Sequence, residues 1–277
     1  MGCKLAICIQ LLFGIRSLAV RIVTFENERG TSVGALVPDG VVDLAELLPA
    51  GTPQAMLEAL IDGFEDVRGA IDALPARPVS EVRLRASVPD PGKVLCVMRN
   101  RPGLEEGDAP PYAYLKYAGG GVGSGDALRL PAESSLWFAP ALAVVVRGPV
   151  RDIAPEDWRE AVFGFTGFVD VVRPGSEFPG GDDWWKSWDT PFAVGPAIVT
   201  VDEVPAGLGL TVGTVTATDP GRPPVADIVS FLSGVMTLRT GDLIALGAHD
   251  AAVVPVSAGS VELDVPGGGR LVVEATT

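Results

Sequence analysis

The residues best suited to chemistry lie between Gly180 and Thr190, where three tryptophans, one lysine and three aspartates share eleven positions. Aromatic rings can hold an apolar ligand by stacking, and the ammonium of Lys186 can bind a carboxylate or an enolate. The same segment is equally consistent with a structural loop whose tryptophans fill the core or a subunit contact. Both interpretations stay open at this point.

Several common mechanisms need residues that this chain lacks. His249 is the only histidine, so an HExxH zinc site is excluded, and a Ser-His-Asp triad would have to use this one imidazole. The glycine run at 119–125 lacks the Lys-Ser/Thr ending of a phosphate-binding P-loop, and we expect a flexible loop there. Cys3, Cys8 and Cys96 form no CxxC pair, and Cys96 lies in an apolar run, which predicts a buried reduced thiol.

Length and composition favour a globular protein. Of 277 residues, 47% are apolar and 20% are charged, and a chain of this length forms one large domain or two unequal ones. With 21 basic and 35 acidic side chains, the net charge is −14, which argues against nucleic acid because phosphate binding needs clustered Lys and Arg. We expect a small-molecule partner, with neither nucleic acid nor a membrane.

The first nineteen residues differ from the rest. Lys4 precedes an apolar run from Leu5 to Ile15, which resembles a secretory signal but is far shorter than the ~20 residues that span a bilayer. Alternation typical of a strand begins only at Val20. We therefore favour a start-site extension at 1–19 that lies outside the fold, and we expect a cytoplasmic protein.

Two regions follow. Strands at 20–25, 33–37 and 41–44, with helices at 53–64 and near 67–74, predict a small α+β domain; with a proline-rich linker after it, this region spans 20–90. The second region, 91–277, is mostly strands, with one helix at 225–236 behind two prolines. The expected strands there are 94–98, 128–130, 137–146, 162–173, 192–201, 210–217, 243–246, 251–256, 261–265 and 271–275.

Six ordered segments resemble motifs of the fumarylacetoacetate hydrolase family. The family has an apolar strand ending in Cys-Val-Gly-x-Asn, then Phe-x-Lys, a strand with Glu-x-Glu, Gly-Tyr-Thr-x-x-Asn-Asp-Val-Ser-x-Arg, Lys-Ser-Phe-Asp-Thr before a Gly-Pro, and a late Leu-x-x-Gly-Asp-x-Ile-x-Thr-Gly-Thr. The similar segments here are Val94–Asn100, Tyr114–Lys116, Phe138–Val146, Gly164–Arg173, Lys186–Thr190 with Gly195 and Pro196, and Leu238–Ala248. The module that begins at Val20 also looks like the family's N-terminal domain.

The resemblance implies an α+β, mostly β fold: a mixed β-sandwich or β-roll catalytic domain with a small N-terminal α+β domain. It also implies a homodimer and a divalent metal that binds 1,3-dicarbonyl or 2-oxo-acid substrates. The known reactions of the family are carbon–carbon hydrolysis, decarboxylation and tautomerisation. All three pass through an enolate, whose charge a hard cation such as Mg²⁺ can stabilise.

The chain departs from the family at the metal. The two glutamates of Glu-x-Glu fall on Ala139 and Ala141, which leaves Asp170 of the three carboxylates, and the hydrolytic histidine falls on Leu104. A hard divalent cation needs several oxygen ligands. We therefore expect no metal and no other cofactor, with Asp170 as the ligand if any metal binds.

The remaining polar groups predict a site without metal. Lys186 and Asp170 can hold an enolate or move a proton, or they form only a buried structural ion pair. His249 would titrate near neutral pH and act as an acid or base, or it is an exposed loop residue without a role. The expected catalytic residues are thus Lys186, Asp170 and His249; the expected substrate-binding residues are Arg173, Trp185, Trp188, Asp189, Thr190, Lys116 and Arg99.

Three functions are compatible with this pattern. The first is a divergent, metal-independent enzyme that performs acid–base chemistry, such as cyclisation, tautomerisation, decarboxylation or carbon–carbon cleavage, on an apolar β-dicarbonyl or polyketide-like compound. The second is a Mg- or Mn-dependent hydrolase or decarboxylase with a rearranged metal site. The third is a catalytically silent binding or scaffold protein. We favour the first, because the lost glutamates accompany retained Lys186 and Asp170.

Overall fold

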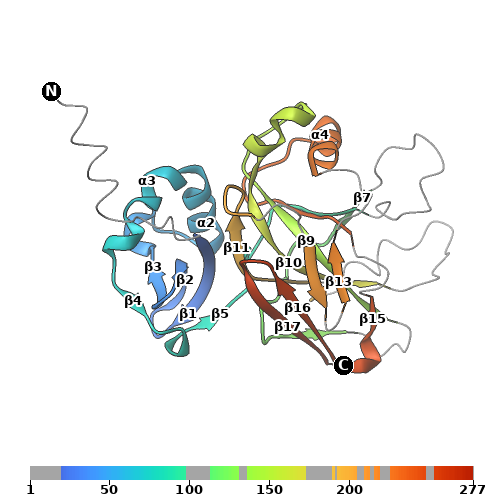
Figure 1. The fold of residues 1–277 in the computed structure, drawn as a ribbon, viewed down its shortest axis with the longest axis horizontal. Coiled ribbons are helices and arrows are strands. Elements are labelled where there is room, and N and C mark those ends of the chain that lie inside the picture. Colours follow the sequence, from blue (N-terminus) through green and yellow to red (C-terminus); the bar gives the residue numbers. More distant parts are fainter. Residues whose placement is uncertain are drawn as a thin grey trace.

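The computed structural model describes residues 20–97, 113–130, 136–172, 189–190, 192–204, 209–212, 215–218, 225–247 and 253–276 (Figure 1). The helices are α2 (Pro53–Asp62), α3 (Phe64–Arg68) and α4 (Val225–Val235), with 3₁₀ turns at Ala45–Leu47, Ile71–Ala73, Val79–Glu81, Pro155–Ala161 and Val256–Ala258. The strands are β1 (Arg21–Asn27), β2 (Gly30–Val37), β3 (Gly40–Asp43), β4 (Ala76–Arg77), β5 (Arg83–Leu84), β6 (Val94–Val97), β7 (Ala113–Lys116), β8 (Ala127–Arg129), β9 (Trp137–Val146), β10 (Val162–Val172), β11 (Phe192–Thr200), β12 (Gly209–Val212), β13 (Val215–Thr218), β14 (Leu243–Ala245), β15 (Val254–Pro255), β16 (Ser260–Val265) and β17 (Gly269–Thr276).

The N-terminal region is a short antiparallel sheet covered by helices. Helix α2 begins where the sequence predicts, because the Thr52 side chain accepts a hydrogen bond from the backbone N–H of Ala55 and Pro53 occupies the first helical position. Its buried side chains, which include Leu57 and Leu60, pack in the same core cluster as β1 and β2. The helix predicted near 67–74 is wrong in its position, because α3 spans Phe64–Arg68 and only the 3₁₀ turn Ile71–Ala73 follows it.

One twelve-stranded sheet runs through both regions. Ten of its strands follow the order β4-β3-β2-β1-β11-β10-β9-β14-β6-β7, and the other two lie off this path, where β5 pairs with β1 and β15 pairs with β9. The connection is made by β1, which pairs with β11 through Ile22 and Ile198. The segment predicted as a linker also contributes strands, because β4 pairs with β3 and β5 with β1. The division into domains at residues 90 and 91 stays a prediction.

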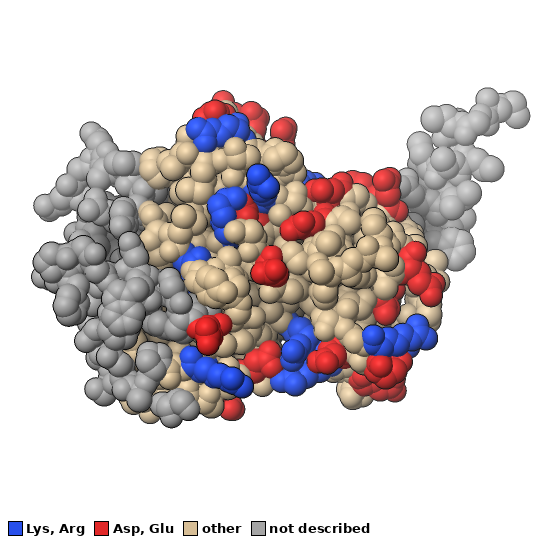
Figure 2. All heavy atoms as spheres, turned by 180° about the vertical axis from the view of Figure 1, so that it is seen from behind, with Lys and Arg blue, Asp and Glu red and all other residues tan. Residues whose placement is uncertain are grey.

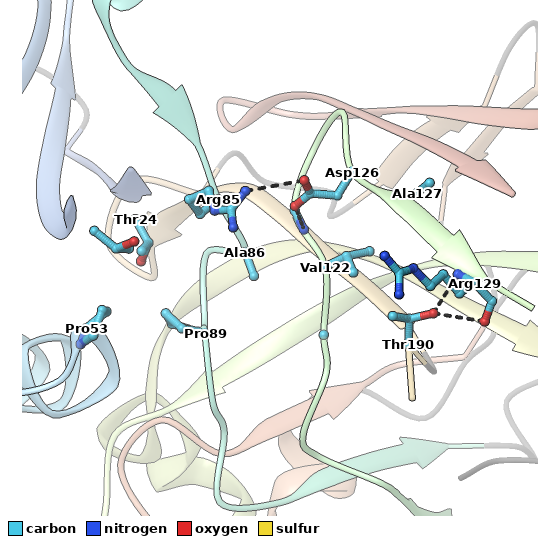
Figure 3. Close-up of a pocket in the computed structure, with 13 residues that line it drawn as sticks. Thr24, Pro53, Arg85, Ala86, Pro89, Val122, Asp126, Ala127, Arg129 and Thr190 are labelled. Atoms are coloured by element: carbon cyan, nitrogen blue, oxygen red, sulfur yellow. Dashed lines mark hydrogen bonds and ion pairs between the residues drawn. The ribbon is translucent and has the colours of Figure 1, made fainter. Parts of the chain in front are cut away.

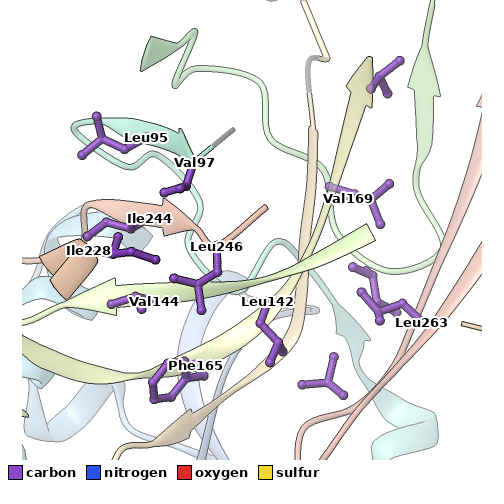
Figure 4. Packing of buried hydrophobic residues seen from close by; sticks show 14 of the residues in the cluster. Leu95, Val97, Leu142, Val144, Phe165, Val169, Ile228, Ile244, Leu246 and Leu263 are labelled. Carbon is purple, nitrogen blue, oxygen red and sulfur yellow. The ribbon is translucent and has the colours of Figure 1, made fainter. Parts of the chain in front are cut away.

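Strands β9, β10 and β11 form the centre of the larger region, and nearly all of their residues are buried. Such continuous apolar runs are typical of strands that are covered on both faces. The predicted range of β9 is confirmed, and those of β10 and β11 agree within one residue. Figure 4 shows the packing on one face of these strands, where Leu142, Val144 and Phe165 meet Ile244 and Leu246.

A second sheet, in the order β13-β12-β16-β17-β8, packs against the first. Buried and exposed residues alternate along β16, so that Val261, Leu263 and Val265 join the core shared with β9 and β10. This arrangement confirms the mostly β sandwich predicted from the sequence. The strand expected at 210–217 is instead a hairpin, β12 and β13, whereas helix α4 lies where it was predicted.

The described surface carries both signs of charge. On the face seen in Figure 2, Lys and Arg side chains occur in small groups beside Asp and Glu and form no continuous basic stripe. Among the helices that the structure describes, none has both the length and the apolar composition of a membrane-spanning segment.

Candidate active site

Three polar side chains meet inside the large sheet. Lys116, the last residue of β7, places its Nζ 2.6 Å from Oδ1 of Asp170, near the end of β10. The Tyr114 hydroxyl donates a hydrogen bond to Oδ2 of the same carboxylate. Both oxygens of Asp170 are therefore engaged, one by an ammonium and one by a hydroxyl.

The fold must curl to bring these residues together. Strands β9, β14 and β6 lie between β10 and β7, which would separate β10 from β7 by roughly 19 Å in a flat sheet at about 4.8 Å per strand. The contact at 2.6 Å shows that the side chains meet across a concave face.

Small residues on the intervening strands make room for this contact. Ala139 lies directly opposite Asp170 in the β9–β10 register, so its side chain is on the same face of the sheet. Ala141 and Ala143 follow on that face of β9, and Ala245 is buried on β14. These short side chains leave space over the sheet that the long side chains of Lys116 and Tyr114 can cross.

Burial differs within the cluster and gives its members different roles. The Lys116 side chain is fully buried, whereas the Asp170 side chain retains 10% exposure. Asp170 is therefore the member of the pair that a substrate can reach, and Lys116 holds it from behind. A buried ion pair lacks the compensation of water, so the geometry of its hydrogen bonds decides its stability.

Tyr114 acts as a donor throughout the neutral range. Burial raises its pKa well above the usual value, and the charge of Asp170 and the neighbouring Cys96 raise it further. A phenol with a raised pKa keeps its proton, so its hydroxyl stays able to donate to the carboxylate. The prediction that Cys96 is a buried thiol is confirmed, since the residue forms no disulfide with any described residue and is 4% exposed.

The described residues do not by themselves fit a divalent metal ion. Ala139 and Ala141 are buried and carry no ligand atoms, and both oxygens of Asp170 already have partners. Within the described part of the chain, no three His, Cys, Asp or Glu residues gather into a metal-binding group. The polar groups that the described residues bring to this cluster are one carboxylate, one ammonium and one hydroxyl.

Lys116 is the one predicted substrate-binding residue that the structure places beside Asp170, where it forms an ion pair. Thr190 lies elsewhere: its hydroxyl accepts from the Arg129 backbone N–H at 2.6 Å and donates to the Arg129 carbonyl at 3.0 Å. Asp189, next to it, is exposed. The other predicted residues, which lie outside the described residues, are Lys186, His249, Arg173, Trp185, Trp188 and Arg99.

Tyr114 was not predicted as a site residue, although the sequence held a signal for it. Residues two apart on a strand point to the same face, so Tyr114 accompanies Lys116. In the Phe-x-Lys pattern that this segment resembles, phenylalanine stands at the position of Tyr114. The hydroxyl that bonds Asp170 is therefore a feature that the family pattern lacks.

Comparison with known proteins identifies relatives over most of the chain. A family model described as fumarylacetoacetate (FAA) hydrolase C-terminal matches residues 93–274. A mitochondrial oxaloacetate tautomerase, FAHD2A of Bos taurus, is 33% identical over 229 residues, which cover 75% of this chain and 73% of that protein.

Solved structures show the same fold. Maleylpyruvate hydrolase from Sphingobium sp. SYK-6, in complex with manganese(II) and pyruvate, has a TM-score of 0.79 and 28% identity, covering 92% of this chain and 98% of its own. A 2-hydroxyhepta-2,4-diene-1,7-dioate isomerase from Mycobacterium marinum has a TM-score of 0.72 and 26% identity, covering 93% and 98%. These relatives are named as enzymes, and their fold confirms the fold class predicted from the sequence.

The manganese in one of these relatives corrects an expectation. The absence of two glutamates led us to expect no cofactor, but a structure of this fold holds manganese(II) together with pyruvate. That finding contradicts the prediction of chemistry without a metal. Ala139 and Ala141 account for the ligands of one motif only, so their lack of ligand atoms was too narrow a basis for that prediction.

Proposed function

The chain belongs to the fumarylacetoacetate hydrolase family, and from this premise we propose that it is an enzyme that interconverts the keto and enol forms of a 2-oxo acid or 1,3-dicarbonyl compound. The observation that carries the proposal is the Lys116–Asp170–Tyr114 cluster, in which Lys116 is fully buried while the Asp170 side chain retains 10% exposure. A tautomerase must take a proton from one atom and return it to another, and one well-positioned carboxylate can do both.

The proton transfer is simple to write. Asp170 accepts a proton from the carbon next to the carbonyl; the electron pair of the C–H bond forms a carbon–carbon double bond, and the π pair of the carbonyl moves to its oxygen to give an enolate. The carboxylic acid then returns the same proton to that oxygen, which yields the enol and restores the carboxylate. The ammonium of Lys116 and the hydroxyl of Tyr114 hold Asp170 in one orientation throughout.

Tautomerisation is favoured over hydrolysis for a reason in the sequence. Leu104 occupies the position that aligns with the family's hydrolytic histidine, so the usual activation of water has no residue there. Relatives named as oxaloacetate tautomerases share 29–33% identity with the chain. Carbon–carbon hydrolysis is the second candidate, because the maleylpyruvate hydrolase has the same fold at 28% identity.

The substrate is proposed to be less polar than a dicarboxylic acid. Ala139 and Ala141 lie on the face of Asp170 in place of two carboxylates, and Phe168 and Phe192 stack on the same face with ring centroids 5.1 Å apart. Apolar walls with a few polar groups are typical of small-molecule sites.

The homodimer and the cytoplasmic location stay predictions from the sequence.

The test is a tautomerase assay with matched variants. Enol-to-keto conversion of oxaloacetate and of a more apolar 2-oxo acid, phenylpyruvate, is followed by ultraviolet absorbance, both after chelator treatment and with added Mn²⁺. Asp170→Asn removes the carboxylate charge with little change of shape and should lower the rate by about 10²–10⁴-fold in the condition where the wild type is active.

Asp43→Asn is the matched control. Asp43 accepts hydrogen bonds from the Ser32 hydroxyl at 2.7 Å and the Ala45 N–H at 3.0 Å in the N-terminal region, so the same chemical change occurs far along the chain. This control should keep the wild-type rate. Equal rates for Asp170→Asn and wild type would overturn the role of Asp170, and inactivity of the wild type in every condition would favour a silent binding protein.

A further inference from the structure

A hollow of about 560 Å³ lies where the N-terminal region meets the larger one (Figure 3). Three parts of the chain form its wall: Thr24, Thr31 and Pro53 from the N-terminal region, 85–89 from the connecting segment, and 121–129 with Thr190 from the larger region. Its volume is in the range of about 300–1,000 Å³ that is usual for small-molecule sites. The hollow is distinct from the candidate active site, since none of Tyr114, Lys116 and Asp170 lines it.

The glycine-rich wall is closely packed, unlike the loose loop that the sequence predicts. Val122 donates its N–H to the Phe192 carbonyl at 3.1 Å and accepts from the Val194 N–H at 2.9 Å, which fixes this segment beside β11. A Cβ atom on Gly121 would lie 2.5 Å from the Phe192 ring, and one on Gly123 only 2.4 Å from the Arg85 carbonyl carbon. Glycine is needed here for close approach, and the wall is formed before any ligand arrives.

The charged residues of the hollow differ in whether they form ion pairs. Asp126 is shared by two arginines, Arg83 at 2.5 Å and Arg85 at 3.4 Å, and it also accepts from the Gly123 N–H. Arg129 has its backbone fixed by Thr190, yet its guanidinium forms no ion pair with any described residue. Figure 3 shows this guanidinium directed toward Val122, at the side of the hollow.

The local charge is positive in a protein that is strongly acidic. Arg85 and Arg129 against Asp126 give the wall a charge of 2 − 1 = +1, while the whole chain carries −14. An arginine fork binds the paired oxygens of a carboxylate or phosphate. The rest of the wall consists of small residues, with Ala86, Pro89 and Val122 as its apolar part and three threonines as its polar part.

We propose that this hollow binds a small organic anion, whose carboxylate or phosphate group is held by Arg129 with Arg85 as the second cation. The apolar part of the wall accommodates the body of the ligand. Thr31, a residue of β2, is among the residues that line the hollow. Binding at this site can be measured without turnover, because none of Tyr114, Lys116 and Asp170 lines the hollow.

The experiment is calorimetric titration of the full chain with two probes, sodium phosphate and sodium malonate, at constant ionic strength. Arg129→Gln removes the guanidinium, and because Arg129 is exposed the variant should fold as the wild type does, which its melting temperature checks. The control, Arg151→Gln, removes an arginine that is also partly exposed but lies outside the hollow. A crystal soaked in selenate locates the anion directly.

We expect at least one probe to bind the wild type at one site, about tenfold more weakly to Arg129→Gln, and unchanged to Arg151→Gln. Preference for phosphate or malonate identifies the chemical group. The proposal is overturned if neither probe binds, if Arg129→Gln binds as the wild type does, or if the selenate peak lies away from Arg129. Since no turnover is measured, these outcomes do not depend on the proposed enzymatic function.

Discussion

Replacing Tyr114 with phenylalanine tests the candidate site most directly. The ring keeps its packing, and the hydroxyl that donates to Oδ2 of Asp170 is lost. A hydrogen bond to a charged group contributes about 1.5–3 kcal/mol. With a loss of about 2 kcal/mol, the melting temperature should fall by about 4–8 °C, at the ~2–4 °C per kcal/mol expected for a chain of similar size.

The same change should affect the reaction more than binding. If Tyr114 orients Asp170 for proton transfer, a loss of about 1.4 kcal/mol in the transition state lowers kcat about tenfold, with KM within about twofold. Tyr117→Phe is the control, since it removes a hydroxyl from the same stretch of chain but at a residue that is 52% exposed. A kcat for Tyr114→Phe equal to that of this control would refute the positioning role.

A pH series adds a second readout. Burial is the main cause, and the charge of Asp170 the second, of a pKa of Tyr114 above its usual value of 10.0. The folded state therefore holds the proton more tightly than the unfolded chain. Its contribution to stability is therefore fully present below pH 10 and is lost as pH rises through the raised pKa. The free energy of unfolding should fall less steeply above pH 10 in Tyr114→Phe than in wild type, and identical slopes would contradict this reasoning.

Three further changes have definite expected outcomes. Gly121→Ala puts a Cβ 2.5 Å from the Phe192 ring, so we expect a loss of about 1–3 kcal/mol in a denaturant titration; no loss would mean that the ring moves freely. Arg68→Met breaks the ion pairs with Asp202 and Glu203, at 2.6 and 2.9 Å, and should cost up to about 1 kcal/mol, less in high salt; a salt-independent loss would point to packing. The double change Ala139→Glu and Ala141→Glu buries two carboxylates on the face of Asp170 and should lower the melting temperature. Added Mn²⁺ should raise the melting temperature of this variant more than that of the wild type. An equal response to Mn²⁺ would refute the link between these positions and the metal.

The sequence predicts the large strands well because their burial leaves a strong signal. β9 and β10 are ten and eleven residues long and mostly apolar, and their many Val and Phe residues favour a buried strand over a buried helix. Short strands are harder to predict. β4 and β5 have two residues each and exist through pairing with β3 and β1, which no local pattern reveals.

The site is less predictable because its parts come from distant strands. Asp170 and Lys116 each matched a motif, but their contact depends on how far the sheet curls, a property of the whole sheet. The pairing of Asp170 with Lys186 stays a prediction, because Lys186 lies outside the described residues. The cofactor was mispredicted because absent ligands in one motif say nothing of ligands supplied elsewhere.

The curled sheet also has a consequence for how the protein folds. Tyr114 and Asp170 are 56 positions apart in the chain, and three strands must be placed between them before their side chains can meet. Contacts of this kind form late, since distant segments must be ordered first. The hydrogen bond from Tyr114 therefore reports closure of the sheet, and a folding intermediate that lacks β14 would have secondary structure but no assembled site.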